Sequence, residues 1–312
     1  MKVGRQLRVL FLGYPNFIYM LAPVLSTKDV QFRPFEGKKR LAWVLPVIWS
    51  DVCYFIGGRY SNNHILTLCR LLNKPVVMHW VGTDVIEAIE AFNTQGGLPR
   101  KVVGSCIHWV ELNWTAKELS SIKISAEIVP LPVMLSTESV SPLPQIFTIL
   151  AYLPAVRPTF YGAHHILRLA KEMPDIRFMC VGSKDSPFHF TSETLPTNIK
   201  LLGRPESLEK VYPASTVLVR VTEHDGLSFM ALEALSHGRY LIWSYPLEGA
   251  HGALVASDYE AMYGHVQALY EKHVQGSLLP NYEGVEFVRS HYDPARIAKD
   301  IRRRFRSLLT GK

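Results

Sequence analysis

One stretch of the sequence, Val217–Ser236, contains three acidic residues, of which Asp225 and Glu233 combine with a glycine at a spacing that suits binding of a phosphorylated ligand. It reads VLVRVTEHDGLSFMALEALS, which predicts a buried strand, a turn, and a helix that begins at about Ser228. Asp225 lies in the predicted turn and Glu233 within the predicted helix. Gly226 allows the backbone to pass close to a ligand. Amides at a helix N-terminus favour a diphosphate, and here they belong to Leu227, Ser228 and Phe229.

Short apolar runs alternate with helical patterns in both halves of the chain, which predicts α/β folding with parallel sheets built from βαβ units. In the first half we expect strands at Arg8–Leu12, Val52–Ile56, Pro75–His79, Cys106–Val110 and Glu127–Val129, and helices at His64–Leu72 and Thr115–Ser121. In the second half we expect strands at Phe147–Ala151, Ile176–Val181, Ile199–Leu202, Val217–Val221 and Tyr240–Trp243, and helices at Gly162–Glu172, Glu206–Ala214, Ser228–Ser236 and Tyr259–Lys272. This pattern predicts two Rossmann-like, doubly wound domains that face a central cleft.

A change of composition marks the boundary between the two halves. Residues 133–144 read VMLSTESVSPLP, and their Ser, Thr and Pro content predicts an interdomain linker. We therefore expect an N-terminal domain over residues 1–138 and a C-terminal domain over residues 139–290. Residues 291–312 form a last helix, for which Asp293 supplies the N-cap and Pro294 the first helical position. Its apolar residues share one face: Ile297, Ile301, Phe305 and Leu308.

Composition and charge exclude several classes of protein. Of the 312 residues, 48% are hydrophobic, which is enough apolar material for two cores. The sequence contains no run of 18 apolar residues that would predict a membrane span. Its four cysteines are scattered singly, which predicts free thiols in a reducing compartment, so we expect a cytoplasmic protein.

The net charge is +7, and residues 291–312 alone carry +5. A cationic helix of this kind suits an anionic membrane surface, bound through Arg302–Arg306, at the inner face of a membrane. The alternative is an ordinary solvated helix face. Nucleic acid is not an expected partner, because Phe305 is the one aromatic residue among the basic ones and stacking platforms are lacking.

The motif at Asp225 resembles that of a known enzyme family. Retaining glycosyltransferases of the GT-B type, family four, carry a Glu-x7-Glu motif with glycine after the first acid and Leu-Glu-Ala at its end. This chain reads DGLSFMALEA from Asp225 to Ala234, followed by His-Gly at 237–238. The spacing is the same, but the first acid is one methylene shorter. The resemblance covers the second half of the chain well and the first half loosely.

The resemblance implies a role for each residue of the motif. Asp225 would act in catalysis by contacting the donor sugar, and Glu233 would bind the ribose of the nucleotide. The backbone amides of Leu227 and Ser228, beside Gly226, would bind the diphosphate. A strand–turn–helix joint with solvated acids is the alternative.

Further matches in the second half concern the rest of the donor. The family holds the diphosphate with two more basic residues after the first strand of this domain; Arg157 corresponds to one, and Tyr152 replaces the other. Arg220 is a candidate for the missing cation. By the same resemblance, two glycines at strand ends would lie near the nucleoside: Gly182 and Gly203.

In the first half the resemblance suggests His79 as a catalytic residue, because the family often has a histidine that faces the cleft after this strand. A histidine buried in the core is the alternative. Asp84, Gly13 and Tyr14 are candidates for the acceptor side, the last two in a short turn where relatives have a longer glycine-rich loop.

These observations predict a glycosyltransferase, similar to hexosyltransferases, that moves a sugar from a nucleotide-diphosphate donor to a glycan, a lipid-linked acceptor or a small molecule, as in polysaccharide biosynthesis. The resemblance implies retention of configuration. No Asp-x-Asp occurs in the chain, so we expect transfer without a metal or another cofactor. Two alternatives stay open: a GT-B nucleotide-sugar epimerase, and a non-catalytic partner subunit that binds a sugar nucleotide.

Overall fold

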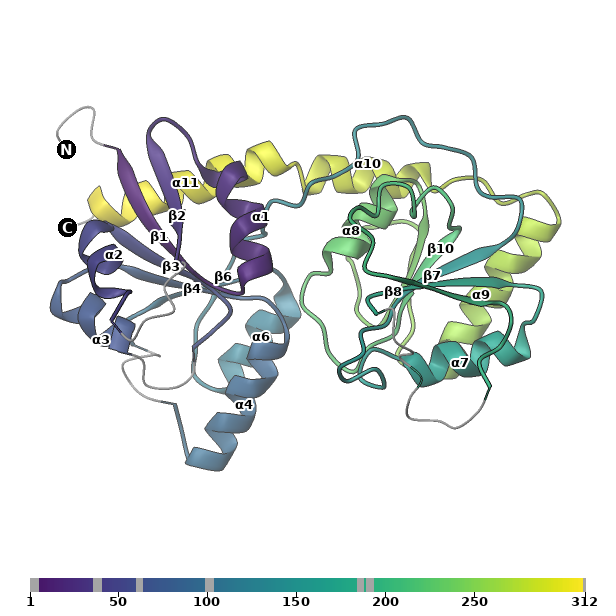
Figure 1. Cartoon of the computed structure of the whole chain (residues 1–312), viewed down its shortest axis with the longest axis horizontal. Coiled ribbons are helices and arrows are strands. Elements are labelled where there is room, and N and C mark those ends of the chain that lie inside the picture. Colours follow the sequence, from purple (N-terminus) through teal and green to yellow (C-terminus); the bar gives the residue numbers. More distant parts are fainter. Residues whose placement is uncertain are drawn as a thin grey trace. The chain divides into compact units, whose positions relative to one another are not determined.

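The computed structural model describes residues 6–35, 41–59, 64–98, 104–183, 188 and 194–310. The chain folds into two compact units, both drawn in Figure 1. Unit 1 comprises Met1–Pro132 and Pro294–Lys312, and unit 2 comprises Val133–Asp293. The boundaries predicted from the sequence, 1–138, 139–290 and 291–312, differ from these units mainly at the last helix. That helix packs on the sheet of unit 1, so it belongs to the first unit in space.

Unit 1 contains a parallel sheet whose described strands follow the order β2-β1-β3-β4-β5-β6. The strands are β1 (Leu7–Gly13), β2 (Val30–Pro34), β3 (Val52–Ile56), β4 (Val76–Trp80), β5 (Ile107–Val110) and β6 (Glu127–Ile128). Every pair of neighbouring strands is parallel, and Gly13 of β1 lies opposite Ile56 of β3. The strand order reverses between β1 and β3, which is where open α/β sheets bind ligands.

Helices cover both faces of this sheet. They are α1 (Pro15–Leu25), α2 (Val44–Trp49), α3 (His64–Leu71), α4 (Thr83–Gln95), α6 (Asn113–Ser121) and α11 (Pro294–Thr310). Helix α11, yellow in Figure 1, packs beside α1 and inserts Phe305 among the rings of Phe32, Tyr54 and Trp109. Ile297, Ile301 and Phe305 are buried, as the amphipathic pattern predicted. Helices α2, α3, α4 and α6 pack on the other face.

Unit 2 contains a second parallel sheet, with the described strands in the order β12-β11-β10-β7-β8-β9. Its strands are β7 (Thr148–Tyr152), β8 (Arg177–Val181), β9 (Ile199–Gly203), β10 (Val217–Arg220), β11 (Tyr240–Trp243) and β12 (Ala253–Val255). Its helices are α7 (Ala163–Glu172), α8 (Phe229–Ser236), α9 (Tyr259–Val274) and α10 (Tyr282–His291). Helices α7 and α9 cover one face of the sheet, and α8 and α10 lie together on the other. The strand order reverses between β7 and β10.

The predicted α/β class with two doubly wound parallel sheets is confirmed, but two segments differ from expectation. Residues 206–214 form turns rather than a helix, because Pro213 disfavours a helical residue before it and the Ser207 hydroxyl accepts from the Glu209 amide instead. Residues 133–144 are not a free linker. The Arg239 guanidinium is fully buried and donates to the carbonyls of Ser141 and Pro142, which holds this segment against unit 2.

Candidate functional site

The strand order of unit 2 places the ends of β7 and β10 side by side, because Ala151 pairs with Val219. Tyr152 is the last residue of β7 and Arg220 the last of β10, so their side chains meet at the reversal point of the sheet. The Arg220 guanidinium lies 5.4 Å from the centre of the Tyr152 ring and 5.9 Å from that of Tyr161. The expected position of the donor site therefore coincides with this cluster.

Asp225 is held at the centre of the cluster by two donors. Arg220 donates through Nε and Nη2 to the two carboxylate oxygens, with 3.0 Å between Nη2 and Oδ1. Trp243, at the end of β11, donates from its indole nitrogen to Oδ2 at 3.2 Å. Burial opposes the charged form of Arg220, but the Asp225 carboxylate more than offsets this, so the pKa of Arg220 is raised. Arg220 is therefore charged, and its two hydrogen bonds orient the Asp225 carboxylate.

The turn that carries Asp225 is fixed by its neighbours. The Ser244 hydroxyl accepts from the Thr222 amide at 2.8 Å and donates to the Thr222 carbonyl at 2.9 Å. The Glu223 amide donates to the Phe160 carbonyl at 3.0 Å, which joins this turn to the loop after β7. These hydrogen bonds fix the backbone of the turn at residues 222 and 223, just before the start of α8.

Helix α8 begins as the sequence predicted. Ser228 is its N-cap, and its hydroxyl accepts from the Ala231 amide at 3.4 Å. Gly226, Leu227 and Ser228 are buried. Because the first amides of a helix lack partners within the helix, this terminus offers donors and a positive dipole to an anion.

Glu233 lies in α8 and has a partner that the sequence did not reveal. The Tyr212 hydroxyl donates to the Glu233 carboxylate, and its ring stacks on that of His237 at 5.0 Å between centroids. His237 in turn lies 3.3 Å from a Glu209 oxygen. Burial raises the pKa of Glu233, while the hydrogen bond from Tyr212 acts in the opposite direction. The carboxylate is therefore oriented by Tyr212 before any ligand binds.

The two glycines assigned to the nucleoside contact each other. The Gly182 amide donates to the Gly203 carbonyl at 2.7 Å, and Arg204 Nε donates to the Gly182 carbonyl at 3.0 Å. Gly182 has a φ of +120°, and a Cβ there would lie 2.9 Å from the Leu153 carbonyl oxygen. A backbone hydrogen bond thus joins the ends of the parallel strands β8 and β9, and a side chain at residue 182 would be strained.

Arg157 lies in the loop after β7, in the left-handed region with a φ of +56°. It is exposed, and its guanidinium lies 4.1 Å from the centre of the Phe160 ring. Since the Phe160 carbonyl binds the Glu223 amide, Arg157 belongs to the loop that borders the Asp225 turn. Arg157, Gly182, Gly203 and Asp225 thus lie at or just after the carboxyl ends of neighbouring strands of one sheet, while Glu233 lies within α8.

His79 has a different environment. Its side chain is fully buried on the face of β4 that α11 covers, and the Tyr54 hydroxyl lies 2.7 Å from its Nδ1. The Trp109 ring meets it edge-on at 5.9 Å between centroids. Burial lowers its pKa to about 3, so the ring is neutral. These observations favour the alternative of a core histidine. Strand alternation places His79 on the face opposite Met78 and Trp80, which belong to the other core of unit 1.

Of the remaining candidates of unit 1, Gly13 and Tyr14 lie at the end of β1, beside the reversal point of the sheet, and Asp84 lies in α4, after β4. The Tyr14 amide donates to the Ile56 carbonyl at 3.2 Å, and a Cβ on Gly13 would lie 1.8 Å from the same oxygen. The Asp84 carboxylate is buried and accepts from the amides of Gly58 at 2.5 Å and Val81 at 3.1 Å. Asp84 therefore joins two loops of the edge, which gives it a structural role there.

The arginines of α11 contact other parts of unit 1. Arg302 donates to the Val24 carbonyl, Arg304 pairs with Glu127 and Asp300, and Arg306 lies 3.5 Å from Asp29. Arg303 pairs with Asp300. Much of the charge assigned to a membrane is thus used in attaching α11 to its own unit. No helix within the described ranges is long and apolar enough to cross a membrane, and the same ranges contain no group of three or more His, Cys, Asp or Glu residues placed to hold a metal ion.

Comparison with known proteins agrees with this geometry. Residues 157–272 match the family model described as "Glycosyl transferases group 1". The match includes Arg157, Gly182, Gly203, Asp225 and Glu233. It confirms the predicted class, a glycosyltransferase, for the part of the chain that holds the candidate donor site. No curated protein matches the sequence.

Solved structures confirm the GT-B fold. Sucrose-phosphate synthase from Thermosynechococcus elongatus has a TM-score of 0.75 at 12% identity, covering 98% of this chain and 100% of that one. Anabaena HepE in complex with UDP-glucose has a TM-score of 0.70 at 10% identity, covering 98% and 100%. TarM of S. aureus, in complex with UDP among other ligands, has a TM-score of 0.62 at 12% identity, covering 84% and 57%.

Sequence reasoning missed Trp243 and Tyr212. A buried tryptophan at a strand end was one available signal, since an indole N–H inside a protein usually has a partner. Tyr212 gave no signal, because it lies in the segment for which a helix was expected.

Proposed function

We propose that the protein transfers a sugar from a nucleotide-diphosphate donor to a hydroxyl group of an acceptor, with retention of configuration and without a metal. The joint between β10 and α8 carries this proposal. There an oriented Asp225, a capped helix start at Ser228 and an oriented Glu233 lie within the segment that matches the glycosyltransferase model. Such an arrangement offers separate contacts for sugar, diphosphate and ribose.

The donor contacts follow from the chemistry of each group. The amides at the start of α8 bind the diphosphate, and Arg157 and Arg220 supply positive charge beside it. Glu233 accepts hydrogen bonds from the ribose hydroxyls. The adjacent strand ends at Gly182 and Gly203 lie against the nucleoside. Because HepE is solved with UDP and with UDP-glucose, uridine diphosphate sugars are the first donors to test.

The reaction breaks the bond between the anomeric carbon and the donor diphosphate and forms a bond from that carbon to the acceptor oxygen. The acceptor's proton passes to a diphosphate oxygen on the same face of the sugar. The role of Arg220, Arg157 and the α8 dipole is to stabilise the negative charge that develops on the departing diphosphate, which metal ions do in other enzymes. Asp225 orients the sugar. His79 takes no part, because its ring is buried and hydrogen-bonded to Tyr54.

We assign the acceptor to unit 1, at the sheet edge that holds Gly13 and Tyr14. That edge is the reversal point of a doubly wound sheet, the position where such sheets bind ligands. The acceptor class is a glycan, a lipid-linked sugar or a small molecule, in a setting such as polysaccharide biosynthesis.

Thermal unfolding in the presence of UDP-, GDP-, ADP- and TDP-sugars tests donor binding, since a ligand of the folded state raises the melting temperature. The proposal requires one donor class to raise the melting temperature of the wild type and not that of the double variant Asp225→Ala, Glu233→Ala.

A second experiment tests transfer and its stereochemistry. The protein is incubated with the donor and an acceptor extract, release of the nucleotide is measured, and the configuration of the new linkage is determined by NMR. Epimer formation without acceptor would instead indicate an epimerase. Donor binding without any turnover would indicate a non-catalytic subunit.

A further inference from the structure

Charge is divided unequally between the two units. Unit 1 contains 22 basic and 10 acidic residues, a net charge of +12, whereas unit 2 contains 12 basic and 17 acidic residues, a net charge of −5. Residues 1–132 and residues 294–312 each contribute +6. The positive charge is therefore a property of the whole of unit 1, and the last helix accounts for half of it.

Unit 1 also exposes aliphatic side chains in one region. Helices α2 and α3 and the turns beside them present five exposed leucine and isoleucine residues, with fractional exposures of 66, 76, 53, 75 and 42%: Leu41, Leu45, Ile48, Leu71 and Leu72. Single exposed apolar residues are ordinary, but a cluster of this kind on adjoining helices marks an interaction surface. We call these five residues the α2–α3 patch.

The members of the α2–α3 patch come from elements that touch. Helices α2 and α3 pack against each other. Lys74, just after α3, donates from Nζ to the Ile48 carbonyl at 3.0 Å, which brings the end of α3 to the end of α2. The five residues of the patch therefore lie on adjoining elements.

Cations border the α2–α3 patch, and acids are missing from it. Neither 41–50 nor 64–74 contains an Asp or Glu, while Arg70 and Lys74 lie within the second range. Arg33 lies 5.4 Å from the centre of the Trp49 ring at the end of α2. The nearby Asp51 carboxylate is paired with Arg8. An apolar centre with a cationic border is complementary to the acyl chains and phosphates of an anionic lipid surface.

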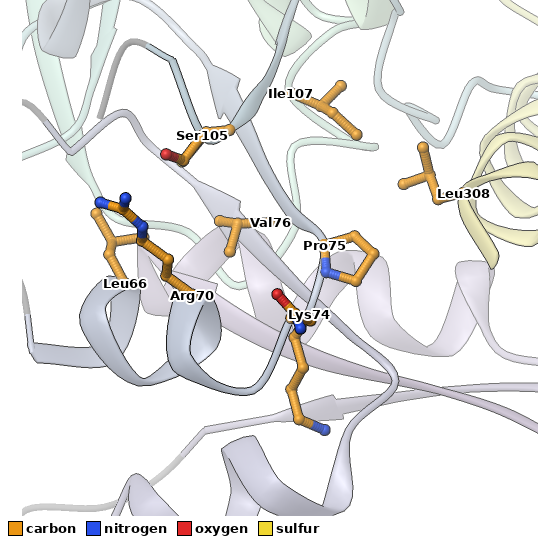
Figure 2. Close-up of a pocket in the computed structure, with 10 residues that line it drawn as sticks. Leu66, Arg70, Lys74, Pro75, Val76, Ser105, Ile107 and Leu308 are labelled. Atoms are coloured by element: carbon orange, nitrogen blue, oxygen red, sulfur yellow. The ribbon is translucent and has the colours of Figure 1, made fainter. Parts of the chain in front are cut away.

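A cavity of about 530 Å³ adjoins the end of α3 (Figure 2). Figure 2 shows Arg70 and Lys74 on one side of it and Leu308, from the last turn of α11, on the other. Pro75, Val76 and Ile107 complete an apolar lining at the amino ends of β4 and β5. The last turn of α11 is thus close to the end of α3.

We propose that the α2–α3 patch is a membrane-docking surface that inserts its leucine and isoleucine side chains into an anionic lipid leaflet. The exposed side chains of Arg33 and Arg70 contact lipid phosphates at its border, whereas Lys74 is already bonded to backbone carbonyls of residues 48 and 50. This assignment differs from a membrane contact through Arg302–Arg306 alone, because several of those arginines are already paired within unit 1. It is also independent of the proposed transferase activity.

The test is co-sedimentation of the full-length protein with phosphatidylcholine vesicles, with and without about one quarter phosphatidylglycerol. The variant Leu45→Ser, Ile48→Ser removes apolar contact without changing charge. The matched control is Val274→Ser, Leu279→Ser, which alters two residues of unit 2 with exposures of 67 and 66%. Both variants should keep wild-type circular dichroism and melting temperature, since all four side chains are exposed.

We expect wild type and the Val274/Leu279 control to bind anionic vesicles alike, and the Leu45/Ile48 variant to bind about tenfold or more weakly. Binding should fall with added salt and with neutral vesicles. Equal binding by the Leu45/Ile48 variant, or no binding by wild type, would overturn the proposal. A wild-type dimer in sedimentation velocity that the Leu45/Ile48 variant abolishes, without vesicle binding, would assign the surface to a second copy. Donor-induced thermal stabilisation, measured on the same samples, reports separately on the transferase proposal.

Discussion

Arg220 and Asp225 form a nearly buried, two-point ion pair at the place where the strand order of unit 2 reverses. Their side chains are 11 and 13% exposed. Arg220 ends β10 beside Tyr152, the residue that replaces an arginine of the family pattern. Under the proposed function, Arg220 would substitute for the cation that is missing from β7, and its two hydrogen bonds orient the Asp225 carboxylate.

Replacing Arg220 with Met should destabilise the protein and abolish donor binding. It leaves the Asp225 carboxylate nearly buried without its charge partner, so we expect the free energy of unfolding to fall by about 3 kcal/mol. The double variant Arg220→Met, Asp225→Asn should recover part of this loss, because no unpaired charge remains, but it should still not bind donor. Urea unfolding and donor titration measure the two effects.

Arg168→Met is the matched control for that experiment. Arg168 also pairs with a carboxylate, Glu172 at 2.9 Å, but its side chain is 52% exposed. We expect a much smaller fall in the free energy of unfolding than for Arg220→Met, because solvent screens the exposed pair, and we expect unaltered donor binding. Normal donor affinity in the Arg220→Met variant would refute the role given to Arg220.

Substitutions of Ser228 should separate helix capping from phosphate binding. Asp and Asn are both good N-caps, so Ser228→Asp and Ser228→Asn should keep wild-type stability, whereas Ser228→Ala should lose about 1 kcal/mol. Ser228→Asp places a negative charge where we expect the diphosphate, so its donor affinity should fall at least about tenfold below that of Ser228→Asn. Isothermal titration with the donor gives the comparison. Equal affinities of the Asp and Asn variants would exclude the start of α8 as the phosphate site.

Replacing Tyr212 with Phe should change the pH dependence of donor binding. The Tyr212 hydroxyl lowers the pKa of Glu233 against the larger effect of burial, so its removal raises that pKa further. Glu233 must be ionised to accept two ribose hydrogen bonds. As the pH falls, the Tyr212→Phe variant should therefore lose donor affinity at a higher pH than wild type. The control is Tyr240→Phe, which removes a hydroxyl bonded to the Leu279 carbonyl and should leave the midpoint of the pH dependence of donor affinity unchanged. Coincident midpoints for the wild type and both variants would contradict this role of Tyr212.

His79 should make the protein sensitive to acid. Its folded pKa of about 3 lies below the ordinary value of 6.5, so between these values the unfolded chain binds a proton that the folded chain does not. Stability from this difference is complete above pH 6.5 and falls as the pH decreases, by up to about 1.4 kcal/mol per pH unit. The variant His79→Phe should show a smaller slope between pH 6.5 and 4 in urea unfolding, and it should retain transferase activity. Loss of activity with an unchanged slope would instead support a catalytic histidine.

The sequence by itself determined the elements whose cause is local. The alternation of apolar runs predicted the β7–α7–β8 and β10–α8–β11 units, and the pattern of Val217–Ser236 predicted a turn followed by a helix that begins at about Ser228. The period of Ile297, Ile301 and Phe305 predicted the buried face of α11. These features depend on neighbouring residues, so one chain segment contains the information for each.

Only the tertiary structure decided which groups meet across strands. Trp243 reaches Asp225 because β10 and β11 are adjacent, and Tyr212 reaches Glu233 because the turns before β10 pack on α8. His79 is a core residue because α11, which lies more than 200 positions later in the chain, covers this face of the sheet and packs Phe305 against Trp109. Strand order and the choice of covering helix depend on the burial of apolar surface by the whole chain, and no local pattern encodes them.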